Sequence, residues 1–358
     1  MQSTSISYHI SLNQTNVIKG VAICAMLWHH LFVGSQEFSS GVERVAATCK
    51  VCVALFVFLS GYGLTIRFEK KSFQGWKNKT AHVVLFLLRR FTKFYLNYWV
   101  VFLLFVPIGV FIFGRTPSVA YGENGSSAIN LLLDFLGLQG YNSYNITWWF
   151  NRLILCLYLF FPFLYWAMKS RLVFPWMLLL LYFDPGSILY PLRFVAQGLD
   201  VYIITFALGI CTAAHKEGLN RALQKINVFA VLCILFAVAA TFLYLRNSGA
   251  FDDSNGFGAD PLATVPLVLF IAVLSNLFDM KFRFLVFLGR HAINIFLLHT
   301  FIFSYFFHSF IYSFENPFLI FLALLCSSLL LSFILEYLKK HLGFYKLQDK
   351  ICAKLDNY

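Results

Sequence analysis

Long apolar runs separated by short polar stretches dominate the sequence. A helix rises about 1.5 Å per residue, so roughly 20 apolar residues are enough to cross the ~30 Å hydrocarbon core of a bilayer. Many of the runs approach this length. The pattern predicts an all-α polytopic membrane helix bundle with about ten transmembrane helices, roughly at residues 16–35, 51–66, 84–113, 148–168, 172–190, 195–214, 226–245, 261–279, 287–313 and 317–338.

Three stretches need separate treatment. The segment at 51–66 is short and is a candidate to extend back towards Cys49. The stretch 128–140 is too short to span and holds Asp134, so it is either re-entrant or interfacial. The first 15 residues are polar, with neither a charged start nor an apolar core, which excludes a cleaved signal peptide. The first membrane segment is therefore expected to act as the targeting signal.

Composition supports a membrane protein. Apolar residues make up 59% of the 358, and only 12% are charged, against about 25% in ordinary soluble domains. There are eight cysteines, and most lie in apolar runs, where a free thiol behaves as a small hydrophobe. Cys49 and Cys52 form a lone CxxC without a second pair, and we expect no functional role for it.

The net charge of +12 would indicate nucleic acid in a soluble protein, but here the charges lie in short loops. If the N-terminus is cytoplasmic, the loops on that side carry a large positive excess and the opposite loops are net negative. This asymmetry predicts that both termini are cytoplasmic, and no nucleic-acid partner is expected. There is no internal repeat and no soluble stretch at either end. Residues 1–358 are thus expected to form a single membrane domain without an extracytoplasmic soluble domain.

Ionisable side chains inside the first apolar segment are the main candidates for chemistry, because such groups are costly in a membrane. Lys19 and His30 are eleven residues apart, about three helical turns, so they share one face, and His30 lies about 16 Å deeper. His29 points to a different face. A cation above an imidazole suits an anionic ligand that delivers a reactive group inward, and histidine suits general-base work. The alternative is a histidine that hydrogen-bonds a neighbouring helix.

Arg89, Arg90 and Lys93 open the third segment. They either anchor the cytoplasmic end of the helix or hold the phosphates of a nucleotide, since guanidinium groups match phosphate oxygens. No metal site is expected.

Further polar residues interrupt the later segments. His299 lies in mid-membrane and is a candidate to line a cavity, whereas Arg290 would face the opposite side of a straight helix. Arg152 either reaches back to water or points into an acceptor site open to the outside. Trp148 and Trp149 fit an interfacial belt, and Trp149 is also a candidate for stacking on a sugar. Interhelical hydrogen bonding is the favoured role of the remaining buried polar residues, Asn97, Asn151, Asp200 and Asn294.

Four stretches form an ordered set that spans most of the chain: 19–32 (KGVAICAMLWHHLF), 55–64 (LFVFLSGYGL), 89–98 (RRFTKFYLNY) and 288–299 (LGRHAINIFLLH). Residues 148–162 (WWFNRLILCLYLFFP) add a Trp, Tyr, Pro pattern. Together with ten spans and cytoplasmic ends, the set resembles the membrane-bound acyltransferase family 3, which includes bacterial O-acetyltransferases of surface polysaccharides. The sequence departs from the family pattern at four places. Lys19 and Lys93 stand where family members more often have arginine, and Leu96 stands where proline is frequent. Many members also have a glutamate near the position of Ile154, and this chain has none there.

The resemblance implies an O-acyltransferase of the inner (plasma) membrane that uses acyl-CoA, usually acetyl-CoA, on the cytoplasmic side. The acceptor would be a hydroxyl of a glycan or a lipid-linked sugar, with membrane lipids as surroundings. His30 would be the acid/base, with Lys19 and His29 beside it, and Arg89, Arg90 and Lys93 would lie near the coenzyme phosphates. The substrate-binding candidates are Ser60, Trp149, Arg152 and His299.

Two other functions compete with this one. A transporter or flippase for an anionic or glycan-lipid substrate would also carry intramembrane cations and histidine, but the halves show no inverted repeat and no matching broken helices. A structural membrane protein without chemistry predicts that replacing His30 changes only stability.

Overall fold

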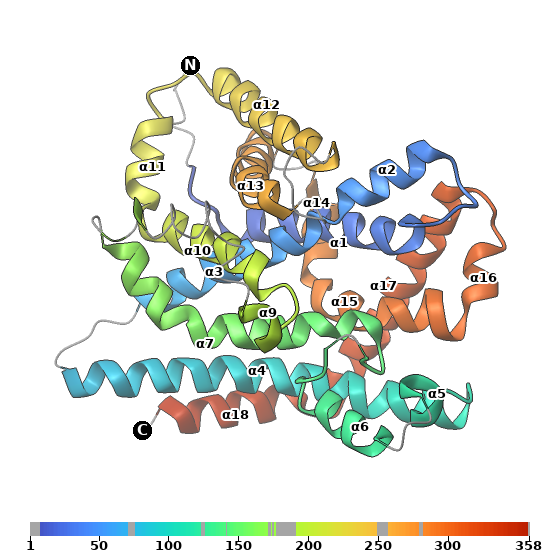
Figure 1. Cartoon of the computed structure of the whole chain (residues 1–358). Coiled ribbons are helices and arrows are strands. Elements are labelled where there is room, and N and C mark those ends of the chain that lie inside the picture. Colours follow the sequence, from blue (N-terminus) through green and yellow to red (C-terminus); the bar gives the residue numbers. More distant parts are fainter. Residues whose placement is uncertain are drawn as a thin grey trace. The chain divides into compact units, whose positions relative to one another are not determined.

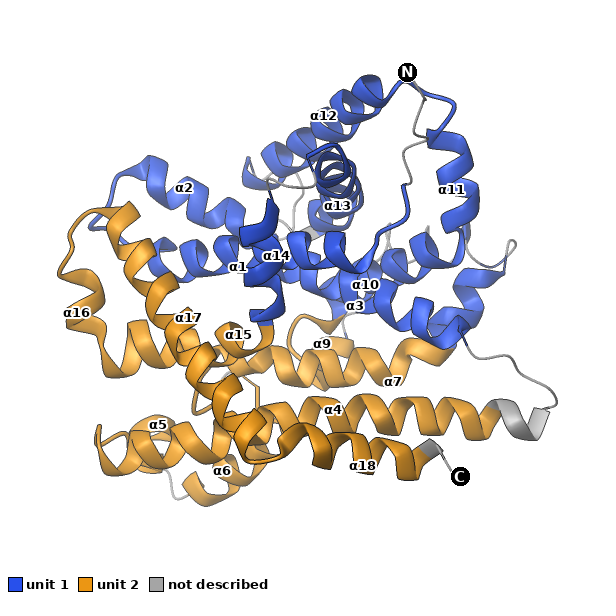
Figure 2. Ribbon diagram, turned by 180° about the vertical axis from the view of Figure 1, so that it is seen from behind, with its two compact units in different colours: residues 1–70, 163–191, 200–292 blue, residues 71–162, 192–199, 293–358 orange. Residues whose placement is uncertain are grey.

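A computed structural model describes residues 8–70, 76–122, 126–140, 142–170, 173, 175–176, 191–248, 257–278 and 282–356. These residues form helices and turns and contain no strand, which confirms the all-α prediction (Figure 1). They divide into two compact units (Figure 2), described separately: residues 1–70, 163–191 and 200–292 form unit 1, and residues 71–162, 192–199 and 293–358 form unit 2.

The first helix of unit 1 begins with a capping box. The side chain of Ser11 accepts a hydrogen bond from the backbone of Gln14, and the Gln14 side chain accepts one from Ser11 in return. Unit 1 contains α1 (Leu12–Phe32), α2 (Ser40–Cys49), α3 (Cys52–Glu69), α10 (Leu199–Ala214), α11 (Lys216–Leu223), α12 (Val228–Asn247), a 3-10 turn (Phe257–Ala259), α13 (Asp260–Leu277) and α14 (Arg283–Arg290). Within this unit, α1 contacts α2, α3, α13 and α14.

Glycines allow two helix pairs in unit 1 to touch backbone to backbone. A side chain at Gly20 would collide with the backbone of Leu285, and one at Gly289 would collide with Asn16, so α1 and α14 form a close seam. Gly61 and Gly209 play the same part between α3 and α10. Small residues at such crossings let helices approach closely where lipid gives little drive for association.

Unit 2 has an aromatic core. Tyr98, Phe102, Trp148 and Phe301 are all buried and in ring-to-ring contact. The unit contains α4 (Trp76–Phe111), α5 (Pro117–Tyr121), α6 (Ser127–Phe135), a 3-10 turn (Ile146–Trp148), most of α7 (Trp149–Lys169), α9 (Leu192–Val195), α15 (Ala292–Thr300), a π-helix (Phe301–Phe306), α16 (His308–Tyr312), α17 (Pro317–His341) and α18 (Phe344–Asp356).

Six helices of the described residues are long and apolar enough to cross a membrane: Ser40–Glu69, Thr80–Phe111, Ile146–Lys169, Val228–Asn247, Asp260–Leu277 and Pro317–His341. The count rises to eight if two bent helix pairs each form one span. The first of these spans confirms the extension beyond Cys49. Two of the ten predicted segments are not among these spans. Segment 16–35 corresponds to α1, which is a continuous helix. Segment 172–190 lies largely outside the described residues. Ten spans and cytoplasmic termini remain predictions.

The bent pairs correct the picture of straight helices. Arg283–Arg290 and Ala292–Phe306 meet at 65°, and Leu199–Ala214 and Lys216–Leu223 meet at 75°. Residues 287–313 therefore do not form one straight helix, and Arg290 and His299 do not lie on opposite sides of a common helix as predicted.

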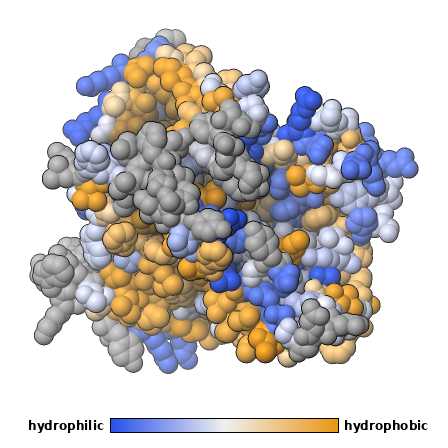
Figure 3. Space-filling view, viewed as in Figure 1, coloured by the Kyte–Doolittle hydropathy of each residue, from blue (hydrophilic) through white to orange (hydrophobic). Residues whose placement is uncertain are grey.

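Apolar side chains also cover much of the outside, as a membrane protein requires. On α12 the exposed fractions of Phe229 and Tyr244 are 70% and 72%, and on α7 that of Phe163 is 67%. Figure 3 shows broad apolar areas over α12 and over α4 and α7.

Candidate active site

Helix α1 carries the predicted acid/base residues. It is unbroken from Leu12 to Phe32, which confirms the helix on which Lys19 and His30 share a face. The side chains of Lys19, His29 and His30 are all half-buried. Arg67, near the end of α3, lies close enough to Lys19 for their charges to repel each other. Two neighbouring cations therefore stand about three turns from the histidines, and an anion would relieve their repulsion.

His29 is fixed by the second helix. Its Nδ1 lies 2.8 Å from the carbonyl oxygen of Ala46 on α2. A carbonyl only accepts, so Nδ1 carries the hydrogen and Nε2 keeps a lone pair, as a general base requires. The ring of His30 meets that of His29 edge-on, with centroids 5.1 Å apart. The structure thus brings two imidazoles together on a half-buried helix face.

A buried ion pair supports the same part of α2. Arg246 Nε and Asp260 Oδ1 are 2.6 Å apart, and their side chains are 4% and 0% exposed. Arg246 Nη1 also donates to the carbonyl of Ala47, 2.9 Å away, next to the carbonyl that holds His29. Arg246 lies at the end of α12 and Asp260 begins α13, and each of the two charges neutralises the other there.

Ser60 belongs to the Leu-Ser-Gly stretch of α3. Its hydroxyl donates to the carbonyl of Phe56 in the same helix, 2.8 Å away, and the side chain is half-buried. The neighbouring Gly61 lies in the close contact with α10. The glycine of this motif thus has a packing role, and substrate binding by Ser60 remains a prediction.

Arg89, Arg90 and Lys93 lie on α4, in unit 2, whereas Lys19, His29, His30 and Ser60 lie in unit 1. The Arg90 guanidinium stands over the ring of Phe86, 5.2 Å from its centroid. Arg89 and Lys93 are four residues apart and follow one face of the helix. Both readings of this group, membrane anchor and phosphate contact, stay open.

His299 is enclosed within unit 2. It is completely buried, and its Nδ1 lies 2.9 Å from the carbonyl of Phe296 in its own helix. Its Nε2 is 3.4 Å from the hydroxyl of Thr300, which is 3.1 Å from the hydroxyl of Thr147. These contacts join α15 to the turn that precedes α7. A substrate role for His299 remains a prediction, and its surroundings are those of a structural residue.

Trp149 and Arg152, the candidates for acceptor binding on α7, are less buried than the adjacent Trp148. Trp149 is half-buried, and Arg152 Nη2 donates to the carbonyl of Phe194, 3.4 Å away. Trp148 is only 1% exposed and packs against Tyr98. The interfacial role predicted for Trp148 is therefore wrong, because its ring fills the core of the unit.

A polar cluster in unit 2 escaped the sequence analysis. Lys339 is 1% exposed, and its Nζ donates to the side chains of Asn97, Asn294 and Glu336 at 2.9–3.1 Å. The interhelical bonding predicted for Asn97 and Asn294 is confirmed. Glu336, three residues before Lys339, could have indicated a charged pair within the apolar run.

Asp134 is the centre of a second cluster in unit 2. The hydroxyl of Tyr121 and the backbone N–H of Tyr144 both donate to its Oδ2, each at 2.5 Å. Its own carbonyl accepts from the hydroxyl of Tyr98, 2.6 Å away. Burial raises the pKa of Asp134 to about 6, and the donated hydrogen bonds oppose that rise. The carboxylate thus ties α5, α6 and the loop before α7 together.

In the described part of the chain, no group of three or more His, Cys, Asp or Glu side chains is arranged to hold a metal ion.

Comparison with known proteins bears on the function. A family model described as "Acyltransferase domain", of the acyltransferase 3 family, matches residues 12–337 of the 358. No curated protein and no solved structure matches the chain. The matched region includes α1 with its two histidines and every stretch on which the resemblance depends. Since the match covers most of the sequence, the chain belongs to the membrane acyltransferases of family 3.

Proposed function

We propose that the protein transfers an acyl group, expected to be acetyl, from cytoplasmic acyl-CoA to a hydroxyl of a glycan or other sugar-containing acceptor at the inner (plasma) membrane. The observation that carries the proposal is the histidine pair of α1, in which the Ala46 carbonyl fixes the His29 tautomer beside His30. Membership of the family supplies the class of reaction.

The chemistry needs one proton acceptor. His30 takes the proton of the acceptor hydroxyl while the hydroxyl oxygen attacks the thioester carbonyl carbon. As the carbon–sulfur bond breaks, the coenzyme sulfur leaves and takes the proton from the imidazolium. The products are an ester and free coenzyme A, and His30 returns neutral. Lys19 supplies positive charge near the path of the anionic donor.

The remaining assignments rest on the family resemblance. Arg89, Arg90 and Lys93 stay candidates for the coenzyme phosphates, and Trp149 and Arg152 stay candidates for the acceptor. By contrast, the hydroxyl of Ser60 and the imidazole of His299 already bond within their own helices.

The test is coenzyme A release by purified protein in lipid nanodiscs, with acetyl-CoA as donor and membrane extract as the acceptor source. Wild type is compared with His30→Ala and His29→Ala, each checked for folding by size-exclusion chromatography and thermal melting. Release by wild type, with a near-complete loss in folded His30→Ala, supports the proposal. An inactive wild type that also fails to bind acetyl-CoA in calorimetry would overturn it.

A further inference from the structure

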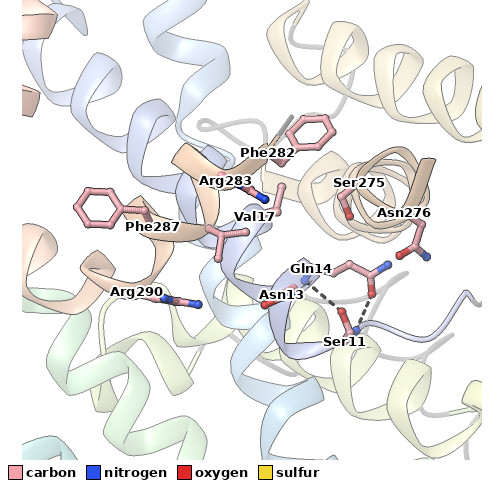
Figure 4. A pocket seen from close by; sticks show the side chains of 11 residues that line it. Ser11, Asn13, Gln14, Val17, Ser275, Asn276, Phe282, Arg283, Phe287 and Arg290 are labelled. Atoms are coloured by element: carbon pink, nitrogen blue, oxygen red, sulfur yellow. Dashed lines mark hydrogen bonds between the residues drawn. The ribbon is translucent and has the colours of Figure 1, made fainter. Parts of the chain in front are cut away.

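A cavity in unit 1 lies beside the first turns of α1. Its volume is about 380 Å³, and it is bounded by the end of α13 and by α14 (Figure 4). The polar side chains around it are Ser11, Asn13, Gln14, Ser275, Asn276, Arg283 and Arg290. None of the eleven residues that line it is acidic. Among the described residues, a polar lining with two arginines and no carboxylate favours an anionic ligand.

The two arginines are placed to act together. Arg283 and Arg290 are seven residues apart on α14, about two turns, so they lie along one side of the helix. In Figure 4 both guanidinium groups are directed towards the space beside α1. Guanidinium groups bind phosphate oxygens in a bidentate way, and two of them in line suit a ligand with more than one phosphate.

The amides add a second kind of recognition. Gln14 is 3% exposed and is held in place, because its Nε2 donates to the carbonyl of Ala272 at 2.9 Å. Asn13 and Asn276 are exposed and present further amide groups to the cavity. Amide side chains offer a donor and an acceptor side by side, which is the pattern that pairs with the edge of adenine.

We propose that this cavity binds the nucleotide end of the acyl donor, with Arg283 and Arg290 on its phosphates and the amides near its adenine. The inference rests on the proposed function, because it assumes that the donor is an acyl-CoA. The volume lies within the range of about 300–1,000 Å³ found for small-molecule sites. It gives the nucleotide a position built from residues of unit 1, whereas Arg89, Arg90 and Lys93 belong to unit 2.

The seam between α14 and α1 makes this position useful. Because Gly20 and Gly289 leave no side chain between the two helices, the arginines are fixed relative to the helix that carries Lys19 and His30. From Gln14 to His30 the helix rises about 24 Å. Asn13, Gln14 and Val17 line the cavity from a different face of α1 than the face that carries Lys19 and His30. The long pantetheine arm of a donor bound there would therefore pass around α1 as well as along it to reach the histidines.

The experiment compares two donors. Acetyl-CoA carries the nucleotide, whereas S-acetyl-pantetheine has the same thioester and lacks it. Arg283→Gln, Arg290→Gln and the double variant are measured with both donors in nanodiscs of zwitterionic lipid. Arg221→Gln, an exposed arginine on α11 outside the cavity, is the matched control.

Each cavity substitution should raise the KM for acetyl-CoA by about 10- to 100-fold, as expected for a lost hydrogen bond to a charged group, with kcat little changed. The kinetics with acetyl-pantetheine should not change, and Arg221→Gln should behave as wild type with both donors. Calorimetric titration with coenzyme A should show the same loss of affinity in the cavity variants.

Several results would overturn the inference. If the cavity variants keep the wild-type KM for acetyl-CoA, the nucleotide binds elsewhere, and the same holds if Arg89→Gln or Lys93→Gln shows the nucleotide-dependent loss instead. An equal loss with both donors indicates a structural role. An effect that appears only with anionic lipid in the nanodisc assigns the arginines to a lipid headgroup. In all these cases wild type still turns over acetyl-CoA; failure of the proposed function is distinguished by a wild type that does not.

Discussion

The two units bury polar side chains in different ways. In unit 1, Lys19, His29 and His30 are half-buried on α1. The hydrogen bond of His29 Nδ1 to the Ala46 carbonyl leaves Nε2 of the same ring with a lone pair. In unit 2, His299 and Lys339 are fully buried. The ring nitrogens of His299 meet a carbonyl and a hydroxyl of its own helix, and the hydroxyl of Thr300 continues to Thr147. The Lys339 ammonium meets amide oxygens of two other helices. Both groups of polar residues interrupt apolar runs in the sequence, so the runs alone do not distinguish candidate catalytic residues from structural ones.

The difference shows what to look for in a membrane helix. A polar group that is enclosed and well bonded serves to join helices, because each bond within the protein replaces one with water. A polar group that is held at one atom and accessible at another can bind or move a proton. On this ground substitutions of His29 and His30 on α1 should change activity, and substitutions of the enclosed His299 and Lys339 in unit 2 should change stability.

The largest expected effect separates the two kinds of histidine. His30→Ala should lower kcat by about 10²–10⁴-fold, the usual contribution of a positioned base, with little change in melting temperature. His299→Ala should lower the melting temperature first, because it leaves buried carbonyl and hydroxyl partners unsatisfied. Coenzyme A release and thermal melting of both variants check this. A stable His299→Ala protein without activity would contradict the comparison.

The buried ion pair gives the next largest effect. Asp260→Ala leaves the Arg246 guanidinium buried without its carboxylate, and we expect a loss of about 3–5 kcal/mol in the free energy of unfolding. Replacing both residues by apolar ones, as in Arg246→Met with Asp260→Leu, should recover most of that loss. Denaturant unfolding in detergent measures both. Equal stability of the single and double variants would show that charge burial is not the cause.

Asp134 predicts a pH dependence of stability. Its pKa is raised from an ordinary value near 3.8 to about 6, so the folded state holds its proton more tightly than the unfolded state does. The associated stabilisation is complete below pH 4 and is lost as pH rises through 6. The difference is about 3 kcal/mol, at about 1.4 kcal/mol per pKa unit.

Asp134→Asn is the control for this dependence. Its amide oxygen can still accept from Tyr121 and from the Tyr144 backbone, but it does not titrate. Wild-type stability, relative to the variant, should therefore fall between pH 4 and pH 7 in thermal melts. A parallel course of the two curves would exclude Asp134 as the titrating group.

The smallest effect tests the close seam beneath the histidine helix. Gly289→Ala places a methyl group against the backbone of Asn16, and overpacking of this kind costs about 1–3 kcal/mol. Gly63 is the matched control, since it lies in helix α3 with nothing within 4 Å of an added Cβ. Gly63→Ala should leave the protein as stable or slightly more so. Similar melting temperatures for the two variants would mean that α1 and α14 can separate freely.

Much of the fold follows from apolar periodicity alone. The helical class and the extension of the second span are confirmed. Nine of the ten predicted segments have counterparts in the described helices, two of them as bent pairs, and α1 is the one of the nine outside the candidate spans. The bend between α14 and α15 could not be predicted, because His291, the residue that joins them, is no usual helix breaker. The polar residues that make α1 a candidate site also lower its hydropathy, which explains why it is absent from the six clear spans.

Only those features of the candidate site that lie within one helix could be predicted from the sequence. The shared face of Lys19 and His30 follows from helical geometry and is present. The carbonyl that fixes His29 and the pair of Arg246 with Asp260 come from separate helices, and nothing in local sequence brings them together. The packing role of the motif glycines was not predicted either. Gly61 allows α3 to contact the backbone of α10, and Gly289 allows α14 to contact the backbone of α1.

The contact of α1 with α14 has a consequence for how the protein is made. Gly20 touches Leu285, so the partner of the first helix is synthesised about 265 residues later. At about 5–20 residues per second, the ribosome needs roughly 15–50 s to produce it. During that interval α1, with a lysine and two histidines among its apolar residues, has α2 and α3 as its main early neighbours among the described helices of unit 1. Insertion of this helix is therefore the step at which membrane chaperones would have most to do.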